Sequence, residues 1–286
     1  MINQIAASYI PSDMPKFFRH AVARLAYLGS EPDRWRDKRD EQLNFAQAPE
    51  HFIDLERVDW IREFPRDRWQ FVRALYERRA SAANPDDLLP EKVGLVPYET
   101  IEVYQRLRNA LRQYRQLKSE HQPTEAVEQD AVFYAGWLSH YVADSSQPLH
   151  TTIHYDGWVG PNPNGYTVHV ESGPGSHPGL HWKFEGVFVA ANIKTEDITP
   201  YMHPVQRLND SFKDYMRFLN GSHSRVAKLY QLDKAKAFDG AGTPEGKQFA
   251  AEDLASGAQM LVNMWYTAWL ESAQPAPNPQ PKVEKK

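Results

Sequence analysis

Two histidines and an aspartate lie close together in the stretch HYVADSSQPLH, which runs from His140 to His150. On a helix, His140 and Asp144 would project from one face a single turn apart, the spacing that two ligands of one metal ion need. A hydrogen-bonded surface pair has the same spacing and is the commoner occurrence. Pro148 ends the helix, and His150 follows it as a third possible ligand. The stretch therefore predicts either a metal centre or a histidine pair of a core helix.

Further residues that bind metals flank this stretch on both sides. His181 and Glu185 form a second pair four residues apart, and upstream Asp33 and His51 each fall near the boundary of a predicted helix. The chain has no cysteine, which excludes disulfide bonds and thiolate metal sites. Four histidines and three carboxylates remain, a nitrogen and oxygen donor set that suits zinc.

Helical periodicity dominates the elements that must position these residues. Apolar residues recur at intervals of three and four along most of the chain, and no alternating strand pattern is evident. The predicted helices cover Met14–Leu28, Tyr98–Lys118, a segment from an N-cap at Thr124 to about Asp144, Trp182–Ala191, Val205 to about Leu232, and Glu245–Ser272. With no internal repeat, the pattern predicts one all-α domain over residues 1–272. The proline-rich and charged end, residues 273–286, predicts a disordered tail.

The segment from Thr151 to Leu180 has neither periodicity and is rich in proline, glycine and asparagine. Long loops inside compact domains are usually functional or disordered. Aromatic side chains here could stack on a base or cover a cationic head group, and polar ones could bind a substrate. An equally good interpretation is that they simply pack the loop. The candidate substrate-binding residues are His154, Tyr155, Asp156, Trp158 and Asn164.

Charge and hydropathy exclude some classes of protein. The formal net charge of −4 argues against a protein that holds duplex DNA mainly by neutralising phosphates. No apolar run is long enough to span a membrane, and the first residues lack the order of a signal peptide. No feature calls for an obligate protein partner.

The central motif resembles a known signature. HYVADSSQPLH is similar to the HYxGDxxQPxH pattern of one superfamily, the zinc-dependent phospholipases C and the zinc nucleases that prefer single strands. The resemblance extends to Asp33 and His51, to LHWKFE around His181, and to the C-terminal MLVNMWYTAWL. It implies an all-helical fold of the phospholipase C and nuclease type, with the long irregular loop beside a metal cleft that holds three zinc ions.

The resemblance also implies roles for individual residues. Asp33, His51, His140 and Asp144 resemble the ligands of a first zinc, and His150, His181 and Glu185 those of a second. Asp144 would bridge the first zinc and a third, and Asp33 is the carboxylate expected to orient the attacking water or to act as its general base.

The sequence departs from the family pattern in three places. Ala143 replaces the glycine of the signature, a small change in a helix. The acid after His181 is a glutamate, as in the phospholipases, whereas the nucleases usually carry aspartate there. The family's N-terminal tryptophan and histidine, which bind the third zinc, are absent, because the chain begins within the helix that follows them. Either Met1 is an internal residue of a longer protein, or the protein works with two zincs.

The sequence-level interpretation is a zinc-dependent hydrolase of phosphodiesters that uses a zinc-activated water. With three zinc ions, the three carboxylates leave a formal surplus of three positive charges, and with two zinc ions they leave a surplus of one. Such a surplus would attract a phosphodiester and stabilise its transition state. Single-stranded nucleic acid and phospholipid head groups both stay open as substrates. Family resemblance implies a secreted or periplasmic protein, although the chain shows no signal peptide. The alternative is a non-enzymatic helical protein with structural zinc or a phospholigand-binding role.

Overall fold

The computed structural model describes residues 1–169 and 179–274, and every regular element in these ranges is a helix. The predicted all-α fold class is therefore confirmed for this part of the chain. The α-helices are α1 (Ile2–Ser8), α2 (Lys16–Arg19), α3 (Val22–Leu28), α4 (Glu31–Arg34), α5 (Glu41–Gln47), α6 (Arg68–Arg79), α7 (Pro90–Val93), α8 (Val96–Ser119), α9 (Glu125–Ser146), α10 (Ala190–Asn192), α11 (Thr195–Ile198), α12 (Ser211–His223), α13 (Val226–Lys234) and α14 (Pro244–Glu271). Tighter or wider turns are η1 (Ala48–His51), η2 (Leu55–Val58), η3 (Pro85–Leu88), η4 (Pro148–Thr151), η6 (Thr199–Tyr201) and the π-helix η5 (Trp182–Val189).

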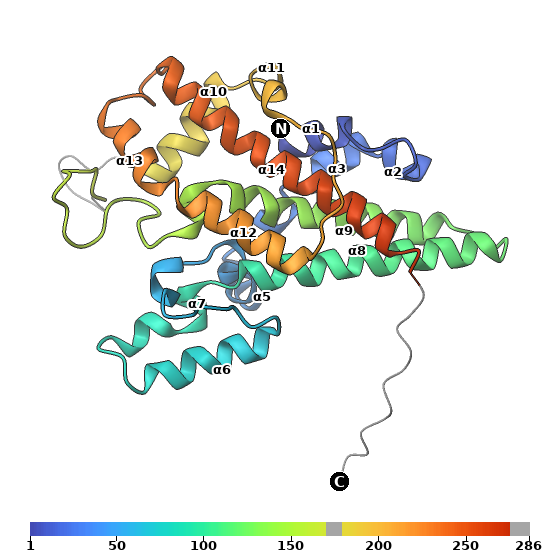
Figure 1. The fold of residues 1–286 in the computed structure, drawn as a ribbon, viewed down its shortest axis with the longest axis horizontal. Coiled ribbons are helices and arrows are strands. Elements are labelled where there is room, and N and C mark those ends of the chain that lie inside the picture. Colours follow the sequence, from blue (N-terminus) through green and yellow to red (C-terminus); the bar gives the residue numbers. More distant parts are fainter. Residues whose placement is uncertain (170–178, 275–286) are drawn as a thin grey trace, which may run out of the picture.

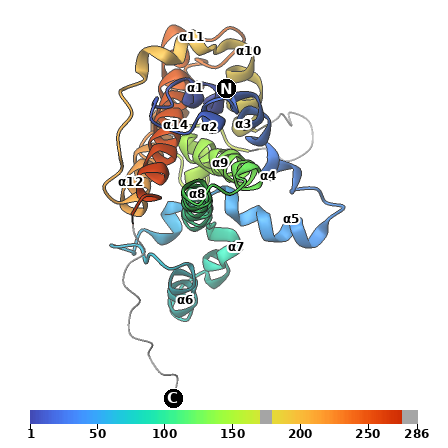
Figure 2. The same cartoon turned by 90° about the vertical axis from the view of Figure 1, so that its right-hand side faces the viewer.

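Helix α9 is the centre of the molecule. It forms a long hairpin with α8, and α14 packs along the same pair (Figure 1). Viewed nearly end-on, α9 is surrounded by α8, α14 and the N-terminal helices α1 to α4 (Figure 2). The C-terminal turns of α9 are thus buried on several sides, which is where His140 and Asp144 lie.

Side-chain size explains how closely α9 is packed. A side chain at Gly136 would bring a Cβ atom to 2.3 Å from the Cβ of Leu28, so only glycine lets α3 approach at this point. On the opposite flank, the α8 stripe predicted from the sequence is buried, and Tyr104, Leu107 and Leu111 have no exposed surface. Burial of these stripes provides the main stabilisation of the hairpin.

Several predicted helices are divided in the structure. The helix expected over residues 14–28 breaks at His20 and Ala21, so that Phe18 reaches Trp265 while α3 turns to pack on α9. The helix expected from Val205 begins only at Ser211 and breaks again between α12 and α13. Asp210 caps α12 by accepting a hydrogen bond from the backbone N–H of Lys213, which explains the later start.

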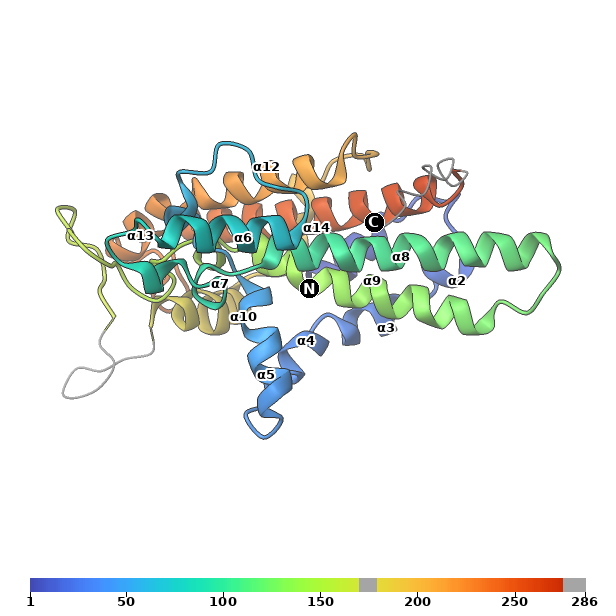
Figure 3. The same cartoon turned by 90° about the horizontal axis from the view of Figure 1, so that it is seen from below.

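The segment from Glu31 to His51 projects from the body as α4 and α5 before it returns to the core at η1 (Figure 3). Two predicted site residues, Asp33 and His51, stand at the beginning and the end of this excursion. Among the described residues, no helix is both long enough and apolar enough to cross a membrane. The predicted tail lies almost wholly outside the described residues, as does the part of the predicted loop from 170 to 178.

Candidate metal centre

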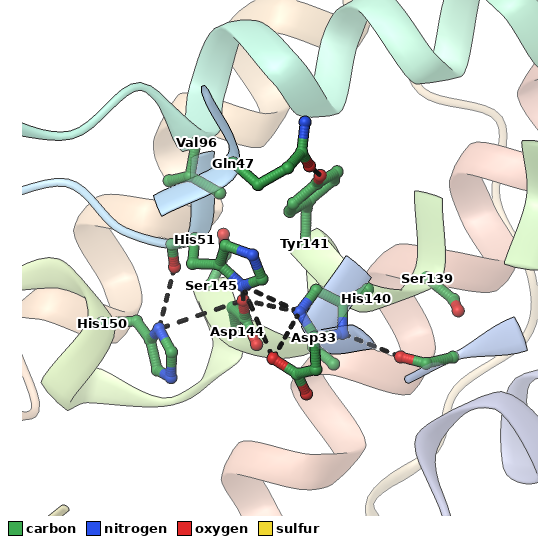
Figure 4. Close-up of polar contacts among 12 residues, drawn as sticks. Asp33, Gln47, His51, Val96, Ser139, His140, Tyr141, Asp144, Ser145 and His150 are labelled. Atoms are coloured by element: carbon green, nitrogen blue, oxygen red, sulfur yellow. Dashed lines mark hydrogen bonds and ion pairs between the residues drawn. The ribbon is translucent and has the colours of Figure 1, made fainter. Parts of the chain in front are cut away.

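Four predicted ligands converge at the C-terminal half of α9. Figure 4 shows Asp33, His51, His140 and Asp144 turned toward a common point. The Nε2 atom of His140 lies 2.9 Å from Nδ1 of His51 and 3.3 Å from Oδ2 of Asp144. Asp33 Oδ1 lies 3.6 Å from His140 Nε2 and 3.9 Å from His51 Nδ1. These four residues are called the inner group below.

The remaining three predicted ligands form a second cluster, the outer group. Glu185 Oε2 lies 2.9 Å from His181 Nε2 and 3.8 Å from His150 Nε2, and the rings of His150 and His181 are 4.7 Å apart. Asp144 Oδ2 is 4.0 Å from His150 Nδ1, so this carboxylate stands between the two groups. The seven residues that the sequence singled out as ligands are thus brought together in space.

Backbone carbonyls orient two of the imidazoles. Nδ1 of His140 donates to the carbonyl of Gly29 at 2.8 Å, and Nδ1 of His150 donates to the carbonyl of His51 at 2.8 Å. A hydrogen bond from one ring nitrogen fixes the tautomer and leaves Nε2 as the ligating atom. No sequence pattern signals these two carbonyls, because any residue can supply them.

The turn before His150 has a sequence signal that the predictions did not use. Gln147 is the N-cap of η4, and its side-chain oxygen accepts a hydrogen bond from the backbone N–H of Leu149 at 2.6 Å. With Pro148 at the first position of the turn, this capping brings Nδ1 of His150 to 4.0 Å from the carboxylate of Asp144. The Gln-Pro of the motif is therefore a structural device that positions a candidate ligand.

Buried charges in the inner and outer groups shift the pKa values of several of their side chains. Burial disfavours the charged form of His140, yet the carboxylates of Asp144 and Asp33 raise its pKa to about 9. For His150, burial is likewise outweighed, and Asp144 and Glu185 raise its pKa to about 9. Although burial opposes ionisation, the imidazoles hold the pKa of Asp144 well below its usual value. Burial lowers the pKa of His51 and outweighs the opposing effect of Asp144.

The donor set fits a divalent metal such as zinc. Without a cation, Nε2 of His140 and Nδ1 of His51 can lie 2.9 Å apart only when a proton lies between them. A metal ion can take the place of that proton, with the carboxylates of Asp33 and Asp144 completing a nitrogen and oxygen set that suits zinc. The described residues contain two groups able to hold an ion, one of Asp33, His51 and His140 and one of His150, His181 and Glu185.

A cleft of about 560 Å³ opens beside both groups. Its wall includes His51, His150 and His181. Basic and acidic side chains both line it, namely Arg36, Arg57, Lys92, Asp54 and Glu91. A smaller cavity of about 90 Å³ lies between α9, η5 and α14 on the side of Asp144 and Glu185. The arrangement offers a bound molecule access to the candidate ligands from the cleft.

The five predicted substrate-binding residues do not share one location. Tyr155 lines the cleft and is 58% exposed. His154 and Trp158 instead stack on each other, with ring centroids 3.9 Å apart, and Trp158 packs against Tyr230.

The other two candidates, Asp156 and Asn164, accept hydrogen bonds from residues beyond the end of the loop. The carboxylate of Asp156 accepts a hydrogen bond from the backbone N–H of His181, and the Asn164 carbonyl accepts one from Lys234. Of the five predicted residues, Tyr155 is the one whose side chain lines the cleft, while the interactions of the others hold the loop to the rest of the fold.

Comparison with solved structures finds a likeness at low sequence identity, whereas no protein-family model and no curated protein matches the chain. A crystal structure of the alpha-toxin of Clostridium perfringens from an avian strain superposes with a TM-score of 0.36 and 14% sequence identity. The match covers 94% of this chain, which spans 61% of the length of that one. A TM-score of this size does not allow a site or its chemistry to be transferred between the two proteins.

Proposed function

We propose that the protein is a zinc-dependent hydrolase that cleaves phosphodiesters in the cleft beside the inner and outer groups. The observation that carries the proposal is the convergence of four histidines and three carboxylates from five separate segments on two adjacent points. Structural zinc sites are closed by four protein ligands, whereas a cleft that reaches both groups leaves room for water and substrate. We infer that the inner and outer groups each bind one zinc ion.

The chemistry follows from charge. When bound, zinc supplies a Lewis acid that activates a water molecule at neutral pH and offsets negative charge gained by the phosphate. Asp33 is two-thirds exposed at its side chain, unlike the buried Asp144, which favours it as the carboxylate that accepts the proton of the attacking water. Arg36 and Lys92 line the same cleft and would bind the non-reacting phosphate oxygens.

The role of Tyr155 in this proposal is to contact the group beyond the scissile phosphate. Its ring is exposed in the cleft wall, so it could stack on a base or cover a lipid head group. Both substrate classes therefore remain part of the proposal. Secretion or location in the periplasm, implied by the resemblance of the motif, belongs to the same proposal.

A test begins with hydrolysis of bis-p-nitrophenyl phosphate by the full chain loaded with zinc. We expect turnover that is abolished by a chelator, restored by added zinc and absent in His150→Ala. His203→Ala is the matched control, because His203 is exposed and belongs to neither group. A single-stranded oligonucleotide and phosphatidylcholine vesicles then identify the substrate class. Zinc binding without turnover of any of the three substrates would refute the hydrolase and support a structural role for zinc.

A further inference from the structure

Two residues of the outer group stand on η5, which packs on the core through Phe184 and Phe188 but carries these candidate ligands on a more exposed face. His181 is the N-cap of η5, and Glu185 lies one turn further along it. The side chains of His181 and Glu185 are 28% and 52% exposed, compared with 7% and 10% for His140 and Asp144. Polar contacts at the start of η5 therefore add to this packing in setting the direction of His181 and Glu185.

Asp156 makes the contacts that fix the start of η5. Its Oδ1 atom accepts a hydrogen bond from the backbone N–H of His181 at 3.1 Å, and its carbonyl accepts one from Leu180 at 3.4 Å. A carboxylate that accepts from the first N–H groups of a helix satisfies donors that have no partner within the helix. The helix is thereby anchored at the residue that carries the first outer ligand.

The other carboxylate oxygen of Asp156 contacts a second residue of the loop, His169. Oδ2 lies 3.0 Å from Nδ1 of His169, so one side chain links residues 156, 169 and 181. Gly179 packs directly on this carboxylate, since a Cβ at that position would stand 1.9 Å from Oδ1. The space is shaped for Asp156 and leaves no room for a side chain at 179.

A second attachment lies within the first turn of η5, at Lys183. Lys183 forms ion pairs with Asp233 at 2.7 Å and Asp239 at 2.6 Å, and the hydroxyl of Thr167 also donates to Asp233. The side chain of Asp233 is only 3% exposed, so these contacts attach η5 and the loop to a buried residue of α13. Asp156 differs from it in contacting the backbone of a candidate ligand.

We propose that Asp156 is a positioning residue for the outer zinc site, setting the affinity of that site through the backbone of His181 without touching the metal. This inference rests on the proposed function, since it assumes that the outer group binds zinc. It reassigns Asp156 from substrate contact, because both of its carboxylate oxygens already have protein partners. Loss of a group that hydrogen-bonds the ring of a metal-binding histidine typically weakens metal binding 10–100-fold, and we take this range for a contact that acts through the backbone of His181.

The test compares zinc affinity at the two groups in the full chain, by titration against a competing chelator. In Asp156→Ala we expect the outer site to weaken by roughly 10–100-fold while the inner site changes less than about twofold. Asp156→Asn retains an oxygen that accepts from His181, and should stay within about threefold of the parent. Gly179→Ala should reproduce the Asp156→Ala defect, because its Cβ displaces the carboxylate.

Asp67→Ala is the matched control. Asp67 also caps a helix, α6, by accepting from the backbone N–H of Gln70 at 2.8 Å, and it lies in neither group. Its loss should cost about 1 kcal/mol of stability, as for other caps, and leave both zinc affinities unchanged. Parent-like outer affinity in Asp156→Ala, or an Asp156→Asn variant as weak as Asp156→Ala, would overturn the inference.

Hydrogen exchange on the metal-free protein separates this inference from the proposed function. Loss of the hydrogen bond should make the His181 amide exchange roughly tenfold faster in Asp156→Ala, with the amides of α9 unaffected. If the parent binds no zinc, the proposed function fails while the exchange result still reports the contact. If the parent binds zinc at the outer group and the amide is not protected by Asp156, the inference alone fails.

Discussion

The inner and outer groups contain similar ligands but are supported in different ways. The inner group takes His140 and Asp144 from the middle of a buried helix, and its rings are oriented by the carbonyl of Gly29 and by one another. The outer group takes His181 and Glu185 from a short π-helix that follows the long loop, where the Asp156 carboxylate and the ion pairs of Lys183 anchor the first turn. The buried helix positions its candidate ligands by packing together with one backbone carbonyl, whereas the more exposed start of η5 also depends on side-chain contacts from the loop and from α13.

Removal of individual ligands should give the largest effects and show whether the groups act separately. We expect His140→Ala to weaken zinc binding at the inner group, and His181→Ala to weaken it at the outer group, each by more than about 100-fold. This exceeds the loss expected when a residue that only hydrogen-bonds to a ligand is removed. Asp144→Asn should weaken both, because Asp144 contacts His140 and also faces His150. Stoichiometry and affinity from chelator competition provide the readout. An Asp144→Asn variant that loses only one ion would show that the carboxylate serves a single group.

Disruption of the buried ion pairs next to His51, which join Arg68 to Glu50 and Glu99, should have the next largest effect, a loss of stability. Arg68 binds Glu50 and Glu99 at 2.7 Å each, and both carboxylates are buried, with side chains 7% and 10% exposed. Arg68→Met leaves these carboxylates unpaired and should lower the free energy of unfolding by about 3–5 kcal/mol. Arg73→Met, on the same helix but in an exposed pair with Glu77, should cost less than about 1 kcal/mol. Denaturant unfolding curves that fail to separate the two variants would contradict this account.

The stability of the metal-free protein should depend on pH through His140 and His150. Both have folded-state pKa values of about 9, above the ordinary 6.5, so their protonation favours the folded state. This stabilisation is fully present below pH 6.5 and is lost as the pH rises through about 9, with an upper limit of roughly 3 kcal/mol for each ring. Zinc replaces these protons, so the loaded protein should show a flatter profile. Thermal unfolding from pH 6 to 9.5 with and without zinc measures the difference, and equal slopes would contradict it.

The smallest effects should distinguish the cleft from the loop that borders it. Tyr155→Ala removes an exposed ring from the cleft and should raise KM by roughly fivefold, with stability changed by less than about 0.5 kcal/mol. Trp158→Ala removes a ring that stacks on His154 and packs on Tyr230, and should cost about 1–2 kcal/mol of stability. Steady-state kinetics and thermal unfolding of both variants provide the measurement. A change of KM in Trp158→Ala but not in Tyr155→Ala would place the substrate contact at Trp158 instead of Tyr155.

The sequence predicted the helical class because it depends on local patterns, and the pairs of possible ligands four residues apart are visible in the same way, whereas the assignment of Asp33 and His51 came from the resemblance of the motif. The spacing of His140 and Asp144 is a property of one helix, and the stripe of α8 is visible from its periodicity. The break at His20 and Ala21 was not predictable, since it serves a distant contact between Phe18 and Trp265. The contact of Asp156 with the backbone of His181 was not predictable for the same reason, because the two residues are far apart along the chain. Interactions between distant segments carry no local signal.

The central claim is that residues of this chain hold two zinc ions side by side. Crystals grown with zinc, with anomalous diffraction recorded on both sides of the zinc absorption edge, would test it most directly. We predict one anomalous peak within about 2.0–2.2 Å of ligand atoms from Asp33, His51 and His140, and a second at the same distances from His150, His181 and Glu185. Peaks elsewhere, or none at either group, would contradict the assignment of the metal centre.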